Sequence, residues 1–311
     1  MTRIGDFTRS AFCVAYKYSG AVRAQERLTR LRGRTFASVL LFHRVTNAIP
    51  EDGITVGTDR FRRICRMLQR SFRVRPLADV VGMIRSGRPV PGRTVAITFD
   101  DCYQDNLPAA RVLAEHGLPA TFFIPTAFVG TEHVFSWDRE LPRMPNLTWD
   151  DVQEIVRLGF EIGSHTVTHA DLGRATMAEA EWELTESKRI LEDRLQRRVR
   201  WIAYPFGQPA NLRAEIVLLM QQAGYEACFS AIGGFLFAGR QDLVLPRFAI
   251  PGFRSILHLE LHMTGCLHWT YALRRQLRLC RVGAAELTSS IDPSFDVPTR
   301  RLHPSGAQLQ R

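Results

Sequence analysis

The sequence predicts an α/β protein built around a parallel sheet. Seven short apolar runs, rich in β-branched and aromatic residues, recur along the chain, and helical patterns lie between most of them. Uninterrupted hydrophobic runs of this length are typical of strands that are buried on both faces, as in parallel sheets. Alternating strands and helices over roughly 200 residues indicate a βα barrel or a doubly wound sheet.

The apolar runs give the expected strands, which cover residues 38–45, 94–99, 120–125, 159–164, 200–205, 226–231 and 243–250. In barrels and in doubly wound sheets alike, ligands bind at the carboxyl ends of the strands. A candidate functional residue should therefore lie where one of these runs ends.

Four helices are expected between the strands, each bounded by a capping residue or a glycine. They cover 106–117, 148–159, a long segment that begins after Thr176, and 211–224. Thr176 and Glu179 form a capping box ahead of the long helix. Asn211 is the candidate N-cap of the last one.

Composition places the chain among ordinary globular proteins. Of its 311 residues, 45% are hydrophobic and 23% are charged. The six cysteines are scattered without a Cys-x-x-Cys pair, so neither a disulfide framework nor a cysteine zinc site is expected. We expect them to be reduced and to pack as small core residues.

The net charge of +10 is confined to the two ends of the chain. Residues 1–36 carry an excess of +6 and residues 270–311 an excess of +4, so the centre is neutral. We expect one catalytic domain, 37–269, between a basic N-terminal helical segment and a basic C-terminal helix with a loose tail. No nucleic-acid partner is expected. The basic ends suit an anionic membrane surface, and the alternative is solvated tails.

The N-terminal run "SAFCVAYKYSGAV" does not predict a membrane-spanning helix or a signal peptide. Lys17 interrupts it within eight residues, which leaves too short an apolar stretch for either. The expectation is a cytoplasmic protein, peripheral at the inner face of the membrane through an interfacial helix. The alternative is a helix that packs on the catalytic domain.

Adjacent carboxylates, Asp100 and Asp101, end the run "TVAITF" in "AITFDDCYQDN". Neighbouring side chains diverge along a strand, so the two need not share one task. One carboxylate can bind a cation while the other accepts a proton. The alternative is the start of a loop or the N-cap of a helix, where aspartate is common.

Two histidines follow another strand end, in "EIGSHTVTH". His165 and His169 converge if the backbone turns there, and Asp101 is the natural third ligand from a neighbouring strand. A His, His, carboxylate set suits zinc or another divalent ion and leaves positions open for water and substrate. Packed or surface histidines are the alternative for this spacing alone.

Five further candidate residues lie at the end of one of these runs or within the last run. His43 ends "LLFHRV" and is a candidate proton carrier, although a satisfied core histidine is the commoner case. In "AYPFGQ", Tyr204, Pro205 and Phe206 form a rigid candidate wall of the substrate pocket. Arg247 lies among apolar neighbours in the last run, where a buried guanidinium requires a carboxylate.

The motifs "TFDD", "SHTVTH" and "YPFG", in this order, resemble the polysaccharide deacetylase family, also called the NodB homology or carbohydrate esterase family 4 fold. The resemblance extends from about Ser38 to Ile250. It implies a deformed (β/α) barrel that removes acetyl groups from N-acetylglucosamine-type residues of a polysaccharide, oligosaccharide or glycolipid. It implies Asp100 as the general base and a divalent metal, zinc before cobalt, nickel or manganese, on three ligands: Asp101, His165 and His169.

The first departure from the family pattern concerns the catalytic acid. Most members have a late Leu-x-His motif, which His258 and His262 fit badly, whereas His43 stands before "TFDD". This order resembles the circularly permuted branch typified by biofilm poly-N-acetylglucosamine deacetylases. The resemblance therefore implies His43 as the acid, and it implies that the backbone N–H of Phe206 stabilises the oxyanion.

The second departure is Ala203, because many members have at this position an arginine that orients the catalytic aspartate. Arg247 is the expected replacement. If Asp100 lacked such support, the alternative would be a catalytically weak carbohydrate-binding or scaffolding protein of the same fold, at a glycan-synthesis complex on the membrane.

Overall fold

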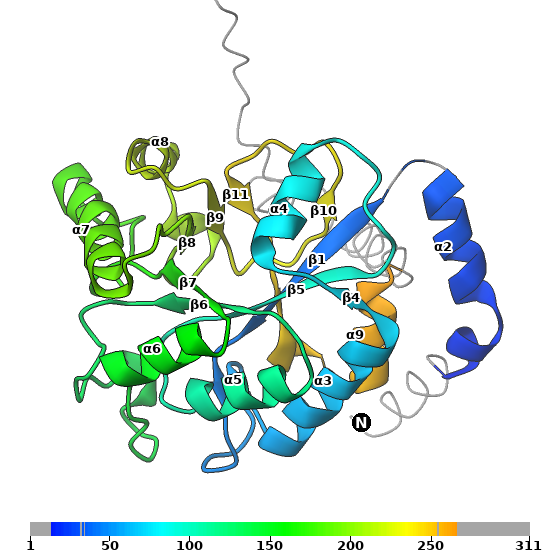
Figure 1. The fold of residues 1–311 in the computed structure, drawn as a ribbon, viewed down its shortest axis with the longest axis horizontal. Coiled ribbons are helices and arrows are strands. Elements are labelled where there is room, and N and C mark those ends of the chain that lie inside the picture. The colour runs from blue at the N-terminus through cyan, green and yellow to red at the C-terminus, as the bar shows by residue number, and fades with distance from the viewer. Residues whose placement is uncertain (1–13, 32, 34, 254, 266–311) are drawn as a thin grey trace, which may run out of the picture. The chain divides into compact units, whose positions relative to one another are not determined.

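The computed structural model describes residues 14–31, 33, 35–253 and 255–265 of the chain. In these residues a single large sheet is surrounded by helices, as Figure 1 shows. The expected C-terminal helix and tail, 270–311, lie outside the described residues, as does the first part of the basic N-terminal segment. The proposed domain boundaries at residues 36 and 269 stay predictions.

Six parallel strands form most of the sheet and confirm six of the seven expected strands. In spatial order they are β1 (Phe36–Phe42), β5 (Thr94–Phe99), β6 (Thr121–Ile124), β7 (Glu161–Ser164), β8 (Trp201–Ala203) and β9 (Ala227–Phe229). Their side chains are almost all buried because both faces of the sheet are covered, as the continuous apolar runs predict.

The seventh expected strand, 243–250, is divided into two short strands that nearly close the sheet into a barrel. β11 (Val244–Leu245) pairs in parallel with β9, and β12 (Phe248–Ala249) pairs in parallel with β1 at the other end of the strand order. Pro246 and Arg247 separate them; Pro246 has no N–H for a ladder hydrogen bond, which favours an interruption here. The division was not predicted.

Short strands accompany this barrel. β4 (Arg73–Val74) pairs with β5, and β10 (Leu236–Phe237) pairs antiparallel with β1, while β2 (Arg44–Val45) and β3 (Thr55–Val56) form a separate small sheet. The sequence did not predict β3, β4 or β10, because two residues are too few to show a period.

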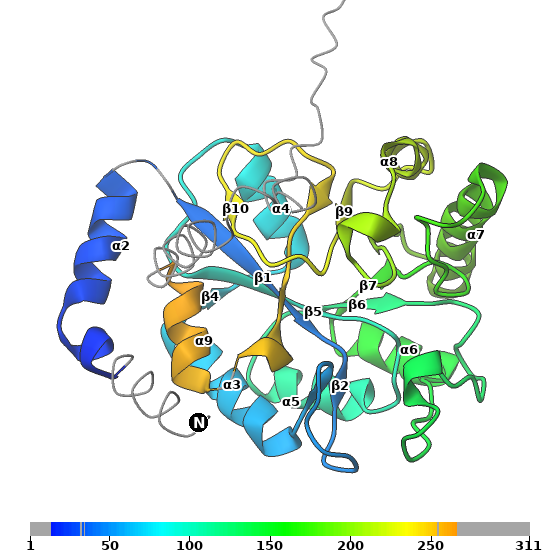
Figure 2. The ribbon, with the colours of Figure 1, turned by 180° about the vertical axis from the view of Figure 1, so that it is seen from behind.

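The outer helices follow the chain around the barrel (Figures 1 and 2). They are α3 (Thr58–Ser71), α4 (Leu77–Arg85), α5 (Asn106–Glu115), α6 (Trp149–Arg157), α7 (Met177–Leu195), α8 (Ala214–Gln222) and α9 (Ile256–Met263). The predicted capping box of α7 is confirmed. Asn211 is not the N-cap of α8, because Pro209–Asn211 already form a short 3-10 helix and α8 begins after Arg213.

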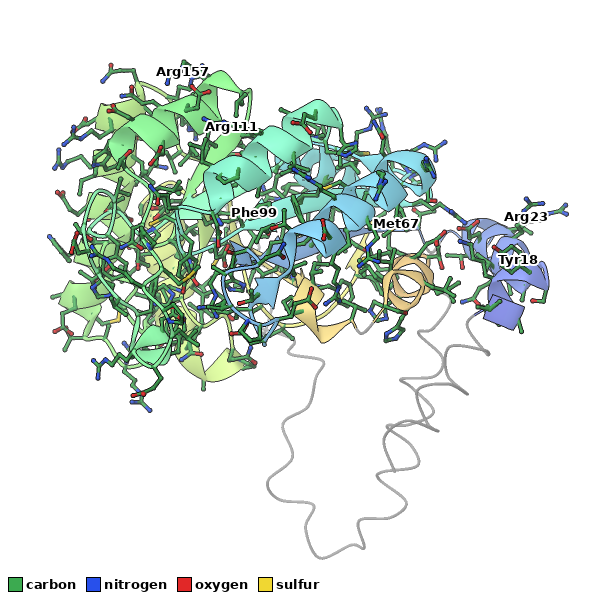
Figure 3. All side chains as sticks on the ribbon, turned by 90° about the horizontal axis from the view of Figure 1, so that it is seen from below. Tyr18, Arg23, Met67, Phe99, Arg111 and Arg157 are labelled. Atoms are coloured by element: carbon green, nitrogen blue, oxygen red, sulfur yellow. The ribbon has the colours of Figure 1, made fainter. Side chains whose placement is uncertain are left out.

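Aromatic packing joins the carboxyl ends of the first strands to helix α3, because Phe61 lies edge-on to both Phe42 and Phe99. Phe99 stacks between Phe42 and Phe122, with ring centroids 5.2 and 4.7 Å apart. In Figure 3, Phe99 lies within the molecule, whereas Arg111 and Arg157 lie on the outer helices. This packing fixes the ends of the strands from which the polar residues follow.

The N-terminal helix α2 (Ala21–Leu31) lies outside α9, farthest from the barrel (Figures 1 and 3). Val22 packs against Leu261, and Glu26 forms an ion pair with Arg93 at 2.6 Å. These contacts favour the packed-helix alternative for this segment. Among the described residues, no helix has both the length and the apolar character needed to cross a membrane.

Candidate active site

The polar candidates converge because they follow neighbouring parallel strands. Phe42 of β1 pairs with Phe99 of β5, so His43 and Asp100 come next at adjacent strand ends, and the Asp100 N–H donates to the Phe42 carbonyl at 3.0 Å. His165 follows β7 directly. These candidate side chains therefore lie together at the carboxyl ends of the strands.

Backbone strain is concentrated at this edge. Five non-glycine residues here have positive φ angles: Asp101, Cys102, Thr166, His169 and Phe206. Such conformations are disfavoured for residues with a Cβ and persist where the surrounding structure enforces them, commonly at functional sites.

Three buried side chains form a group that can hold a metal ion. Oδ1 of Asp101 lies 3.2 Å from Nε2 of His165 and 3.3 Å from Nε2 of His169. The ligand atoms of the group all lie within 4.8 Å of one another. Oδ1 of Asp101 is enclosed and makes no well-formed hydrogen bond within the described part of the chain, and both imidazole nitrogens face it. Two imidazole nitrogens and a carboxylate oxygen fit a divalent cation such as zinc.

The first histidine is held by a backbone carbonyl. Nδ1 of His165 lies 2.6 Å from the Ala203 carbonyl oxygen, which accepts its proton and leaves Nε2 facing Asp101. Ala203 thus contributes its backbone to the site although it lacks the side chain that many family members have there.

The loop between the two histidines is held by Glu183 on α7. One carboxylate oxygen of Glu183 accepts the N–H groups of Val167 and Thr168 at 2.7 and 3.0 Å, and the other accepts the Thr168 hydroxyl. The sequence analysis missed Glu183. A signal was present, because this acidic residue stands beside Leu184 on the otherwise apolar stripe of the helix.

Asp100 is joined to Arg247 in a two-pronged ion pair. Nη1 and Nη2 of Arg247 donate to the two carboxylate oxygens at 2.7 Å each, and Nε donates to the Ser230 carbonyl at 2.9 Å. Burial on its own raises the pKa of Asp100, but Arg247, together with His165 and His43, outweighs it, so the pKa lies below its usual range and the carboxylate is ionised.

His43 lies within the field of these charges. Burial lowers the pKa of its imidazole below the usual range, although Asp101 and Asp100 oppose the shift. Nδ1 of His43 is enclosed without a hydrogen bond among the described residues, and Asn106 holds the His43 carbonyl through its side-chain amide at 2.7 Å. The ring therefore has an unused polar atom, and the charges of both aspartates act on its pKa.

The turn after β8 forms one wall of the site. The Tyr204 hydroxyl donates to the Gly207 carbonyl at 3.0 Å. Gly207 has a φ of +65°, and a Cβ there would lie 2.4 Å from the Ala231 backbone nitrogen, so only glycine fits. Within the described chain no acceptor is found for the Phe206 N–H, and the Phe206 ring lies 5.0 Å from that of His169.

Two other features do not belong to this site. In α9, His258 and His262 pack against Phe253, with ring centroids 5.5 and 5.0 Å apart, and neither joins the group around Asp101.

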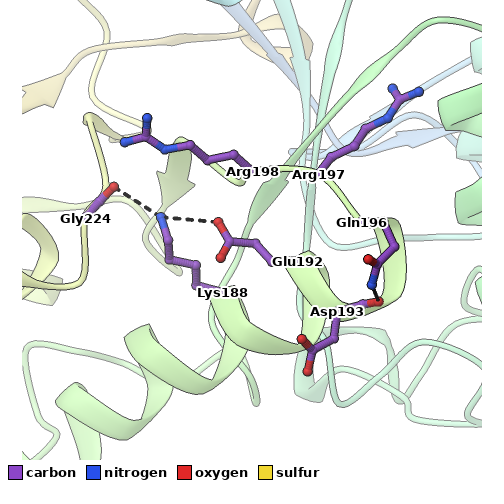
Figure 4. A pocket seen from close by; sticks show the side chains of 7 residues that line it. All are labelled: Lys188, Glu192, Asp193, Gln196, Arg197, Arg198 and Gly224. Atoms are coloured by element: carbon purple, nitrogen blue, oxygen red, sulfur yellow. Dashed lines mark hydrogen bonds and ion pairs between the residues drawn. The ribbon is translucent and has the colours of Figure 1, made fainter.

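A shallow depression of about 540 Å³ lies at the C-terminal end of α7, lined by Lys188, Glu192, Asp193, Gln196, Arg197, Arg198 and Gly224 (Figure 4). These residues immediately precede β8 and β9, so the depression is at the opposite end of the barrel.

Comparison with known proteins gives a family match over part of the chain. Residues 87–228 match the polysaccharide deacetylase family. It is 34% identical to the chitooligosaccharide deacetylase of Bradyrhizobium over 127 residues, which cover 39% of this chain and 45% of the relative. It is 25% identical to the poly-β-1,6-N-acetyl-D-glucosamine N-deacetylase of Staphylococcus aureus over 173 residues, 51% of this chain and 55% of the relative.

A solved structure supports the fold. The deacetylase PplD of Streptococcus pyogenes superimposes with a TM-score of 0.63 at 22% identity, over 74% of this chain and 99% of that one. The predicted deformed barrel of the polysaccharide deacetylase type is thus confirmed. The chain spans about half the length of the curated relatives it matches.

Proposed function

We propose that this protein is a metal-dependent hydrolase that removes N-acetyl groups from N-acetylglucosamine-type residues of a glycan. The observation that carries the proposal is the buried group of Asp101, His165 and His169 beside a separate aspartate, Asp100, which is held ionised by Arg247. The deacetylases of chitooligosaccharide and of poly-N-acetylglucosamine among its relatives support this class of substrate.

The chain's own residues supply binding groups and proton transfer. A divalent cation held by Asp101, His165 and His169 would supply Lewis-acid polarisation of the acetamide carbonyl and would acidify a water molecule. Asp100 accepts the proton of the attacking water, since its carboxylate is ionised and fixed in orientation. The Phe206 N–H, which is free of protein acceptors in the described chain, stabilises the oxyanion that forms as the water adds to the carbonyl.

His43 donates a proton to the amine as the C–N bond breaks. Burial favours the neutral imidazole, so His43 must be protonated before this step, and the negative charges of Asp101 and Asp100 favour that protonation. The position of His43 beside Asp100 at the end of β1 supports this role, as does the electrostatic coupling of its imidazole to both aspartates. In the proposed cycle the acid thus comes from the early part of the chain, in keeping with the resemblance of the motif order to the circularly permuted branch. Zinc is the proposed metal because two imidazoles and one carboxylate are a common zinc ligand set.

Metal analysis of the purified full chain, combined with acetate release from N-acetylglucosamine oligomers, tests the proposal. Asp100→Asn should abolish acetate release and leave the bound metal near one equivalent, whereas His165→Ala should lower the bound metal itself. His43→Ala should reduce kcat and retain the metal. A wild-type chain that binds no divalent ion would contradict the mechanism.

A further inference from the structure

Two large aromatic side chains stand partly exposed beside the proposed metal group. Trp137 is 37% exposed and Phe206 is 47% exposed. Their ring centroids lie 5.4 and 5.0 Å from that of His169, and 6.0 Å from each other at an interplanar angle of 76°. Exposed apolar side chains occur singly on any surface, but a pair beside a buried polar centre indicates a ligand-binding surface.

The indole of Trp137 is fixed in orientation. It stacks on the buried ring of Phe135, with centroids 4.6 Å apart and an interplanar angle of 16°. Its Nε1–H donates to the hydroxyl of Tyr103 at 3.1 Å. Phe135 thus covers one side of the indole and the protein satisfies its only polar group, so what Trp137 exposes is apolar ring surface without a hydrogen-bonding group.

A buried ion pair secures the arrangement from below. The Tyr103 hydroxyl donates to Oδ2 of Asp138 at 2.6 Å, and Oδ1 of Asp138 pairs with Nη1 of Arg44. The Arg44 guanidinium also lies over the Tyr103 ring, 5.4 Å from its centroid. Arg44 and Asp138 are almost completely buried. Removing both charges from water carries a desolvation cost, which charged residues of a solvent-facing loop do not have.

We infer that Trp137 is the platform on which the pyranose ring of the substrate N-acetylhexosamine stacks. A pyranose presents a flat face of C–H groups and a polar rim, and an indole whose N–H is already bonded offers only its flat surface in return. The network of Tyr103, Asp138 and Arg44 positions the platform next to His169, so a stacked sugar has its acetamide at the metal group. This inference rests on the proposed deacetylase function and assigns a residue that recognises its substrate.

The test compares Trp137→Leu with Trp137→Phe in the full chain, using N-acetylglucosamine tetramer as the probe. Leucine keeps apolar bulk but has no flat ring, so binding measured by calorimetry should weaken roughly five- to tenfold, with a matching rise in KM and a smaller change in kcat. Trp137→Phe keeps a flat ring, so it should bind the tetramer more tightly than Trp137→Leu and less tightly than wild type. Metal affinity should be the same in all three proteins. Trp182→Ala, at another exposed tryptophan on α7, is the matched control and should leave binding unchanged.

Three results would overturn the inference. Trp137→Leu could bind the tetramer as tightly as Trp137→Phe and wild type, or it could lose metal, which would assign Trp137 to the support of His169. Wild type could also bind no tetramer at all. A wild-type chain that binds the tetramer without releasing acetate would contradict the proposed function alone, because the binding comparison still decides the role of Trp137.

Discussion

Arg247 and Asp100 meet through two hydrogen bonds of 2.7 Å, although 147 residues separate them in the chain. The pair joins the split strand that closes the barrel to the end of β5. Removing one partner of a buried pair leaves an uncompensated charge, which typically costs about 3–5 kcal/mol. Arg247→Met should therefore lower the free energy of unfolding by about that amount and abolish acetate release.

Urea unfolding of single and double variants checks this expectation. The double variant Asp100→Asn with Arg247→Met leaves no unpaired charge and should be more stable than Arg247→Met alone. Arg247→Lys keeps the charge but not the forked geometry, so it should fall between wild type and Arg247→Met in both stability and activity. Equal stability of the single and double variants would show that the two residues are not coupled.

Glu183 should set metal affinity without touching the metal. Its carboxylate orders the loop between the two histidines, and groups that hold a metal ligand in place typically contribute tenfold to a hundredfold to affinity. Glu183→Gln should raise the metal dissociation constant within that range, as measured by competition with a chelator. Glu181→Gln, an exposed site on the same helix, should behave as wild type. Identical metal dissociation constants for the two variants would show that Glu183 does not support the metal ligands.

Asp105 should contribute more to stability at low pH than at neutral pH. Burial raises the pKa of its carboxyl to about 6, and Oδ2 is enclosed without a hydrogen bond among the described residues. Because the folded pKa exceeds the unfolded one, the neutral form stabilises the fold at low pH and this contribution is lost as pH rises through the folded pKa, by roughly 2–3 kcal/mol.

Asp105→Asn cannot ionise and should escape that loss. Its free energy of unfolding relative to wild type should therefore increase from about pH 4 to about pH 7 and level off above. Denaturant unfolding at four or five pH values measures the difference. A difference that stays constant with pH would show that Asp105 does not titrate in this range.

Contact with an anionic membrane stays a prediction, and α2 carries the residues that test it. Arg23 and Arg27 are exposed on this helix, and Figure 3 shows Arg23 at the edge farthest from the barrel. The full chain should sediment with vesicles containing anionic lipid at low salt and be released by roughly 0.5 M salt. Arg23→Glu with Arg27→Glu should abolish sedimentation. If the wild-type chain stays in the supernatant, the membrane prediction is contradicted and the role of α2 is to pack on α9.

The parallel strands and the group of Asp101, His165 and His169 were predictable from the sequence because each depends on a local pattern. A buried strand reads as a continuous apolar run, and polar residues at its end share one edge of the sheet. The interruption at Arg247 and the partners of Glu183 depend on which distant groups meet. The sequence could therefore show Glu183 as an acidic residue on the buried stripe of its helix, but it could not show what this residue binds. Ala203 left open a scaffolding role, and Arg247 supplies a guanidinium to Asp100 from the interruption between β11 and β12.

The late position of the divided strand in the sequence also determines when the proposed active site can form during synthesis of the chain. A nascent chain that ends before β11 contains both aspartates and both histidines, yet it lacks Arg247 and the contacts of β12 with β1. In such a chain the Asp100 carboxylate has no guanidinium to hold it ionised inside a barrel. The segment from β11 to β12 therefore closes the barrel and also supplies the partner of the proposed general base, Asp100. A chain that ends before this segment should be inactive.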